Sequence, residues 1–197
     1  MTFNKAAGRC FPRLLVIAAV LALASPAAAV ENLKIGAKLG SIDFAIGNSK
    51  IFRTVGSFTD WKGMVKVDDA NVANSSVDVA INTGSIQMLD AQQTAMLKDT
   101  DFFDVTRFPE MIFHSTRIER TGETTLKVDG DVTLRGVTRP MTLAVTVSDR
   151  RPDAAPGARY ARFRAIGTIK RSQFGMTKYI DMVGDTVEIS ISTDAQR

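Results

Sequence analysis

The chain has few of the residues that carry out catalysis or bind transition metals. Its 197 residues include one histidine, His114, and one cysteine, Cys10. Zinc sites need cysteine and histidine clusters at short spacings, and the sequence has no such cluster. A Ser-His-Asp site would need His114 to face a pocket, yet His114 takes the outward position of an alternating segment, without a nucleophile-elbow motif. We therefore expect no enzymatic activity, no metal site and no required cofactor.

The sequence also lacks a hydrophobic run long enough to span a membrane. The longest run, Leu14–Ala24, has 11 residues, and as a helix it would cover roughly 16 Å, about half of a bilayer core. It follows three basic residues and precedes Ala27-Ala28-Ala29, which is the arrangement of a secretory signal peptide. We predict that residues 1–29 are cleaved and that residues 30–197 form a periplasmic protein without a stable transmembrane anchor.

The predicted mature chain carries little net charge. The full chain has 25 basic and 21 acidic residues, a net charge of +4. The signal segment holds three of the basic residues and no acidic residue, which leaves 22 − 21 = +1. This balance gives no support for nucleic-acid binding. The remaining 168 residues (197 − 29) contain no cysteine and suit one domain with a sizeable core.

Alternation of apolar and polar residues with period two dominates the mature chain and predicts β-strands. Eight segments show it, around residues 42–46, 65–67, 77–81, 111–113, 126–134, 141–147, 163–169 and 187–191. Turn residues separate them, and residues 148–158 form a long loop. One helix is expected at Asp90–Lys98, between the third and fourth strands, with Asp90 as its N-cap. The pattern predicts an all-β fold, an eight-stranded antiparallel barrel with one short helix.

The inward positions of these strands are apolar, which leaves two interpretations open. They could fill the barrel as an ordinary core, or they could surround a ligand. Mid-strand glycines such as Gly130 and Gly167 favour free space, because glycine has no side chain to pack. The connection Ile86–Phe108 is long and rich in methionine and aromatic residues, and it is typical of a lid. Together these features favour a cavity for a flexible hydrocarbon.

Three motifs connect the chain with a known family. They are Asp101-Phe102-Phe103-Asp104 with Phe108-Pro109-Glu110-Met111-Ile112-Phe113, then Gly130-Asp131-Val132-Thr133-Leu134-Arg135-Gly136-Val137-Thr138-Arg139-Pro140, then Gly167-Thr168-Ile169-Lys170-Arg171-Ser172-Gln173-Phe174-Gly175. In this order and spacing, between about Leu39 and Asp194, the chain resembles the YceI-like family of periplasmic lipid-binding proteins. The resemblance implies a lipocalin-like barrel that holds a polyisoprenoid, quinone or fatty-acid-like lipid, and it implies a homodimer, to which an outward Ile112 would contribute.

The expected ligand contacts are the apolar residues of the inward strand faces and of the long connection. They are Ile42, Phe44, Ile46, Phe58, Val79, Ile81, Met88, Met96, Leu97, Phe102, Phe103, Met111, Phe113, Val132, Phe163, Gly167, Ile169 and Phe174. Contacts with a headgroup are expected from Asn48, Arg171, Ser172 and Gln173. The chain departs from the family where histidines are common, with Leu39, Asn48 and Gln93-Thr94-Ala95-Met96 in their places. For Arg171, a turn-capping or surface role is an equal alternative.

Two functions of different classes fit this sequence. The first is a periplasmic carrier or store for a long-chain isoprenoid or acyl lipid, such as a polyprenyl quinone. The second is a non-catalytic interaction module that modulates a membrane or redox partner, with the lipid as structural filler. Both functions use the same fold, so the sequence alone does not distinguish between them.

Overall fold

The computed structural model describes residues 1–2, 30–47, 53–151 and 154–197. In this part of the chain the strands form one antiparallel sheet of 11 segments. They are β1 (Glu31–Gly36), β2 (Gly40–Ile46), β3 (Thr54–Phe58), β4 (Trp61–Val67), β5 (Ser76–Asn82), β6 (Ile86–Met88), β7 (Glu110–Arg120), β8 (Thr125–Leu134), β9 (Val137–Ser148), β10 (Arg159–Lys170) and β11 (Thr186–Gln196). The helical segments are the 3-10 helices η1 (Val72–Asn74), η2 (Thr83–Ser85) and η3 (Arg171–Phe174) and the α-helices α1 (Ala91–Lys98) and α2 (Ile180–Val183).

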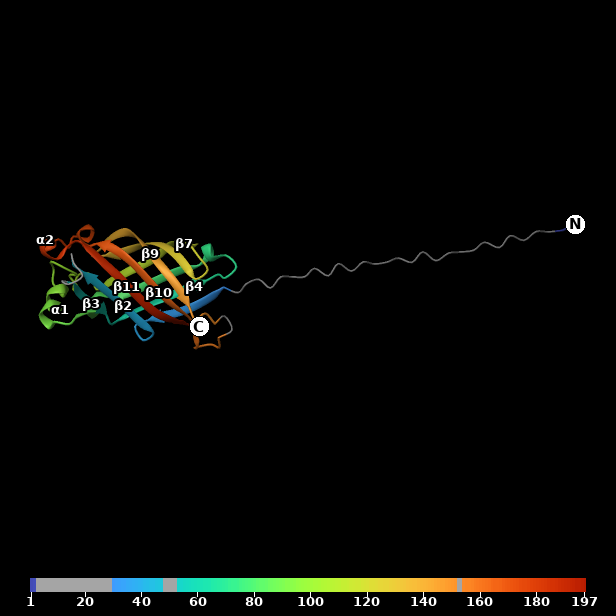
Figure 1. Cartoon of the computed structure of the whole chain (residues 1–197), viewed down its shortest axis with the longest axis horizontal. Helices are drawn as coiled ribbons and strands as arrows, with labels where there is room; N and C mark the ends of the chain where they lie inside the picture. The colour runs from blue at the N-terminus through green and yellow to red at the C-terminus, as the bar shows by residue number, and fades with distance from the viewer. Residues whose placement is uncertain (3–29, 48–52, 152–153) are drawn as a thin grey trace.

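The sheet closes into the expected eight-stranded barrel (Figure 1). Its order is β1-β4-β5-β7-β8-β9-β10-β11, and β1 returns to β11 where Lys34 lies opposite Gln196. The segments β2, β3 and β6 continue the sheet from the other part of β11. Each of the pairs β1–β2, β3–β4 and β5–β6 is one long strand with a short interruption. The antiparallel barrel predicted from the alternation is therefore confirmed.

The three interruptions lie side by side and form a crease across the sheet. The amide of Ala37 donates to the carbonyl of Trp61 at 3.0 Å, and the amide of Asn82 donates to the carbonyl of Asp60 at 3.0 Å. The amide of Thr59 donates to the carbonyl of Ser85 at 3.2 Å. These bonds satisfy backbone groups that leave the regular ladder where the sheet changes direction.

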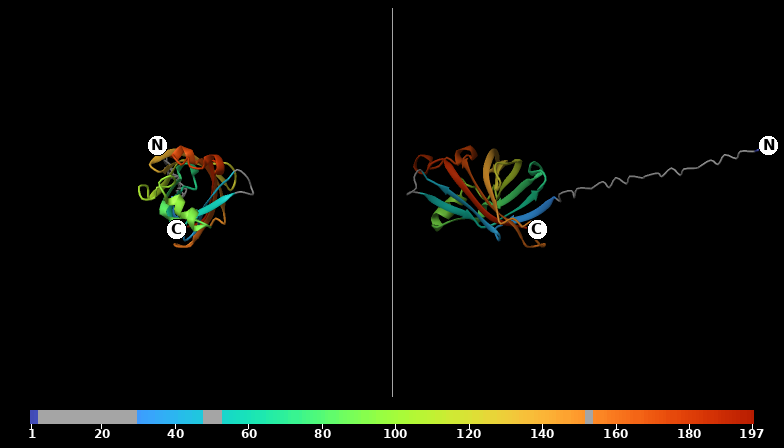
Figure 2. Two further views of the ribbon diagram at one scale, coloured as in Figure 1. Left: turned by 90° about the vertical axis from the view of Figure 1, so that its left-hand side faces the viewer. Right: turned by 45° about the vertical axis from the view of Figure 1, so that its right-hand side comes forward.

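The barrel has two different ends, which Figures 1 and 2 show at opposite sides of the molecule. The helical end carries α1, η3, α2 and the turn at residues 135–136 between β8 and β9. The loop end carries the connections at residues 68–75 and 121–124 and the described residues 149–151 and 154–158, together with the start of β1 and the C-terminus. Which end is filled and which is open decides where a ligand can enter.

The expected helix is confirmed, with the expected cap. Asp90 precedes α1, and its side chain accepts a 2.8 Å hydrogen bond from the amide of Gln93. The one-turn helix α2 and the strand segments β1, β3 and β6 were not expected from the sequence. The predicted signal peptide lies outside the described residues apart from residues 1–2, as does Asn48. Among the described residues, no helix is long and apolar enough to cross a membrane.

Candidate ligand cavity

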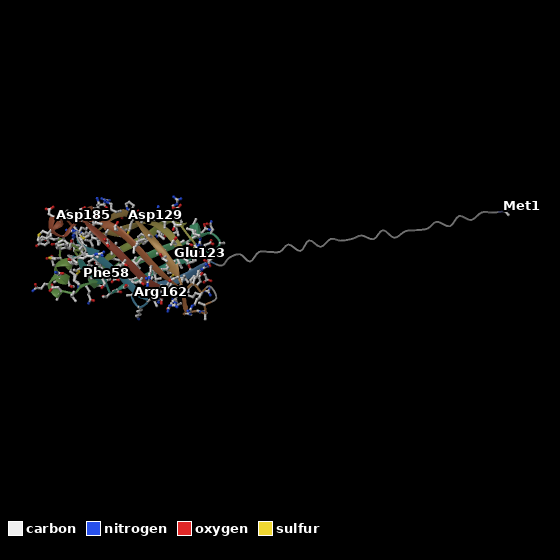
Figure 3. All side chains as sticks on the ribbon, in the orientation of Figure 1. Met1, Phe58, Glu123, Asp129, Arg162 and Asp185 are labelled. Atoms are coloured by element: carbon white, nitrogen blue, oxygen red, sulfur yellow. The ribbon has the colours of Figure 1, made fainter. Side chains whose placement is uncertain are left out.

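A cavity of about 270 Å³ lies inside the barrel and runs from the loop end to the middle of the strands. Hydrocarbon side chains from every strand of the barrel line it, at the inward positions of the alternating pattern. Of the exposed charged residues in the lining, Asp69, Arg120, Glu123 and Arg150 lie at the loop end, and Asp43 lies on β2. The cavity therefore opens to solvent at the loop end, where Figure 3 shows Glu123 far from Asp185 of the helical end.

Many of the predicted contacts meet in this cavity. They come from β2, β3 and β5 and from β7, β8 and β10, and they are Ile42, Phe44, Phe58, Val79, Ile81, Met111, Phe113, Val132 and Phe163. The alternation placed all of these side chains except that of Phe58 on the inward face, and their positions in the barrel agree with it.

The other predicted contacts lie outside the cavity lining, nearer the helical end. They are Ile46, Met88, Met96, Leu97, Phe102, Phe103, Gly167, Ile169 and Phe174. Several of them fill that end as packed core: Phe102 is 6% and Phe174 1% exposed, and the Phe103 ring meets Phe58 edge-on at 5.7 Å. Arg135 ties the segment down by donating to the carbonyls of Thr100, at 2.8 Å, and Phe102. The segment expected to be a lid is thus packed as a plug, with Phe102 buried and Phe103 and Phe108 half-buried.

The mid-strand glycines do not leave the space expected of them. An added Cβ at Gly130 would lie 2.5 Å from Cζ of Phe113, because that ring already covers the glycine. At Gly167 it would lie 2.9 Å from side-chain atoms of both Met141 and Leu143. Neighbouring side chains therefore occupy the room over these glycines, and the free volume lies further toward the loop end.

The side chain of Arg171 holds the helical end together through hydrogen bonds in this structure. It is 5% exposed, and its guanidinium donates to the carbonyls of Gly184 at 2.9 Å, Met176 at 3.1 Å and Lys178 at 2.8 Å. Burial lowers the pKa of Arg171. These bonds join η3 to the loop that contains α2, on the far side of the plug from the cavity opening.

Ser172 and Gln173, which were expected to contact a headgroup, are also hydrogen-bonded within the protein or exposed to solvent. Ser172 donates from its amide and from its hydroxyl to Asp185, at 2.8 Å each. Desolvation of Asp185 opposes its ionisation, but these two bonds and the charges of Lys170 and Arg171 together outweigh it and lower the pKa of Asp185. Gln173 is exposed to solvent. None of these side chains reaches the cavity lining.

A polar cluster borders the cavity opening at the loop end. Tyr160 is 1% exposed, and its hydroxyl donates to Asp69 at 3.0 Å. Arg150 forms an ion pair with Asp69 and lies 5.9 Å from the centre of the Tyr160 ring. Burial raises the pKa of Tyr160, so that its hydroxyl remains a donor. This cluster joins the loop after β4 to the loop before β10 and fixes one side of the opening.

Asp68, next to Asp69, stabilises the loop that contains it. The carboxylate of Asp68 accepts hydrogen bonds from the amides of Ala70 and Asn71, at 3.0 and 2.9 Å, and from the side chain of Asn74 at 3.0 Å. The bond from Asn74 is the largest cause that lowers the pKa of Asp68. Of the described residues, no three histidine, cysteine, aspartate or glutamate side chains are grouped so that they could hold a metal ion. His114 is exposed and pairs with Asp78 on the outer face.

Sequence reasoning missed the residues that give the cavity its polar character. Asp69, Arg150 and Tyr160 lie in or beside turns, where charged residues are common, and no periodic pattern shows that they meet. Trp61 was also missed, although it starts an alternation with Gly63, Val65 and Val67 and is the only tryptophan of the chain. That alternation was a signal from which its inward position could have been found.

The comparison with known families decides what kind of barrel this is. A sequence profile described as the YceI-like domain matches residues 34–195. The chain belongs to the YceI-like family. A UPF0312 protein of Ectopseudomonas mendocina is 32% identical over 156 residues, which cover 79% of this chain and 81% of that protein. A UPF0312 protein of Yersinia pestis is 34% identical over 153 residues, which cover 78% of this chain and 79% of the relative.

Solved structures of this family share the barrel. BcnA of Burkholderia cenocepacia superposes with a TM-score of 0.68 at 27% identity, over 80% of this chain and 96% of that one. The YceI protein of Campylobacter jejuni gives a TM-score of 0.67 at 22% identity, over 77% and 88% of the two chains. A polyisoprenoid-binding domain from Saccharophagus degradans, implicated in plant cell wall breakdown, gives a TM-score of 0.60 at 10% identity, over 85% and 99%. At such low identities, the last two likenesses concern the fold.

Proposed function

We propose that this YceI-like protein binds the apolar chain of an isoprenoid or acyl lipid inside the barrel and carries or stores that lipid in the periplasm. The observation that supports this best is the cavity itself, which is lined by hydrocarbon and aromatic side chains and opens at one end. The name of the Saccharophagus degradans domain, which binds a polyisoprenoid, points to the same class of ligand. A periplasmic location rests on the signal-like residues 1–29.

The size and lining of the cavity fit a segment of hydrocarbon chain. At roughly 30 Å³ for each water-sized group, a volume of about 270 Å³ holds about nine such groups. Nine methylenes removed from water contribute roughly 7 kcal/mol before the ordering costs of binding are subtracted. An apolar chain therefore supplies enough binding energy without a specific polar contact, and one barrel can accept lipids with different headgroups.

The charges at the opening argue against a ligand with an anionic headgroup there. Arg120 and Arg150 are accompanied in the lining by Asp68, Asp69 and Glu123, so the opening has no surplus of positive charge. Arg150 is already paired with Asp69. A phosphate would need a cluster of uncompensated cations. The proposal therefore favours an uncharged lipid, such as a quinone, an alcohol or an amide, over a phosphorylated one.

Native mass spectrometry of the protein purified from its own host tests the proposal directly. We expect one chain lipid per barrel, released and identified by solvent extraction. Protein stripped of lipid and offered a mixed lipid extract should take up the same class again. A barrel that is isolated empty and takes up no lipid would contradict the carrier function. That result would favour the alternative, an interaction module that modulates a membrane or redox partner.

A homodimer remains part of the proposal. Ile112 lies on the outer face of β7 and is 44% exposed, and burial of such a side chain between two copies would stabilise their association. Light scattering of the mature protein at micromolar concentrations should give twice the monomer mass, and Ile112→Asp should lower it. A monomer mass that does not change with concentration would exclude the dimer.

A further inference from the structure

The cavity stops at one level of the barrel, short of the helical end. On β2 its lining reaches Phe44 but not Ile46, which lies nearer to that end. On β11 the lining reaches Ile189, which lies opposite Phe44, but not Val187. Of the five described residues of β3, Phe58 alone belongs to the lining, and Figure 3 shows it further toward the helical end than Glu123. The free volume therefore has an inner limit near the crease.

Three phenylalanine rings meet at this limit, and we call Phe44, Phe58 and Phe103 the floor of the cavity. The centre of the Phe58 ring lies 5.7 Å from that of Phe44 and 5.7 Å from that of Phe103, which it meets edge-on. Such pairs are packed aromatic contacts. Phe44 and Phe58 face the cavity, whereas Phe103 belongs to the plug and lies outside the lining. The plug therefore stands directly behind the Phe58 ring, which is 6% exposed.

The backbone around the floor holds its rings in place. Phe58 lies opposite Ile86 of β6, which is fully buried. The Phe44 ring covers Gly56, where an added Cβ would lie 2.4 Å from its Cζ. The plug behind these rings is fixed by the two hydrogen bonds from Arg135. Because packed interiors yield little, we expect the floor to stop a chain that reaches it.

The end of a ligand that reaches the floor must be apolar. Beside the floor the lining consists of apolar side chains such as Met111 and Ile189. Asp43, next to Phe44, alternates to the outer face, where its carboxylate accepts a 2.7 Å hydrogen bond from Ser41. A headgroup brought to the floor would lose its hydrogen bonds with water and find no partner there. The hydrocarbon end therefore enters first, and the headgroup stays at the opening.

We infer that the floor limits the length of hydrocarbon chain that the barrel buries, to about nine carbons for the present cavity volume. Carbons beyond this limit remain at the opening. Phe58 is the residue that sets the limit, because its ring lies between those of Phe44 and Phe103. This inference rests on the proposed function and adds to it the orientation of the lipid and a selectivity for chain length.

Straight-chain primary alcohols from n-hexanol to n-tetradecanol test the limit, because they are uncharged and differ only in chain length. Equilibrium dialysis against the lipid-free mature protein gives each dissociation constant. We expect this constant to fall about fourfold for each added carbon, the factor that corresponds to roughly 0.8 kcal/mol per methylene, up to about nine carbons. Beyond that length it should fall less than about 1.5-fold per carbon, because the added carbons stay in water.

Phe58→Ala should move the limit. It removes the phenyl ring from the floor, and the space left behind should take about three further methylenes, since the surrounding side chains relax only partly. The variant should therefore bind n-dodecanol about 20-fold more tightly than the wild type does. Phe163→Ala is the matched control, because Phe163 lines the wall opposite Val147 and Thr193, nearer the opening. It widens the cavity without deepening it, so its limit should stay where it is in the wild type.

Phe58→Leu covers the case in which Phe58→Ala does not fold. It removes about one methylene of volume, so its limit should move by about one carbon. Three results would overturn the floor and leave the carrier proposal standing. They are a wild-type affinity that keeps rising through n-tetradecanol, a limit that is unchanged in a folded Phe58 variant, and an equal shift in Phe163→Ala. Failure of every alcohol to bind overturns the carrier proposal, and the inference with it.

Discussion

Replacement of Ala165 by leucine is expected to lower the affinity for a chain lipid by roughly 50-fold while the barrel stays folded. Ala165 lies on β10 between Val145 of β9 and Ile191 of β11, and all three side chains line the cavity. Leucine adds three carbons to this free volume and displaces about three methylenes of the guest. At roughly 0.8 kcal/mol each, the loss is about 2.4 kcal/mol, and each 1.4 kcal/mol is a factor of ten.

The stability of the lipid-free protein should change in the opposite direction. Filling a cavity commonly raises the free energy of unfolding by about 0.5–2 kcal/mol. Urea denaturation of lipid-free Ala165→Leu therefore checks that the variant is folded and that the added carbons occupy empty space. The same substitution at Gly167 would be a poorer test, because its Cβ would lie 2.8 Å from the carbonyl oxygen of Thr142, which belongs to the backbone.

Ala144→Leu is the matched control. Ala144 lies next to Val145 on β9 but points outward, where it is exposed. The control adds the same three carbons on the other face of the sheet, so it should bind lipid as the wild type does. Lipid occupancy that is unchanged in a folded Ala165→Leu would show that the guest binds outside this cavity. A similar loss in both variants would show that the effect does not depend on the cavity.

The strands that face the interior could be predicted because burial on one side leaves a period-two pattern. Leu126, Val128 and Val132 of β8, for example, all take inward positions that the alternation indicated. The same reasoning missed β1 and β3 as separate segments, because the crease divides long strands into short ones. Five residues with a glycine at position 56, as in β3, show too little alternation to be recognised.

The end at which the cavity opens could not be predicted from the sequence. The aromatic side chains of Phe102 and Phe103 predict that this segment is buried, but not what it is buried against. The same residues would fit a lid over a ligand or a plug in the core. What decides is the contact between distant segments, such as Arg135 with the carbonyl of Phe102. In the same way, Asp69 and Tyr160 belong to connections whose meeting depends on closure of the whole barrel.

The second large effect is expected at Arg171, on the stability of the protein. Arg171→Met keeps an unbranched side chain of similar length but removes three hydrogen bonds. It leaves the carbonyls of Met176, Lys178 and Gly184 without their donor. A hydrogen bond to a charged group is worth about 1.5–3 kcal/mol, and part of the loss is offset because a cation no longer has to be desolvated. We expect the free energy of unfolding to fall by about 3 kcal/mol, measured by urea denaturation.

The affinity for lipid distinguishes this fastening role from contact with a headgroup. Arg171 lies outside the cavity lining and at the helical end, so Arg171→Met should keep its affinity under conditions in which it is folded. Arg164→Met is the matched control on β10, because Arg164 is exposed, and it should change the stability by less than about 0.5 kcal/mol. A variant Arg171→Met that is as stable as the wild type but binds lipid at least tenfold more weakly would place the headgroup at Arg171.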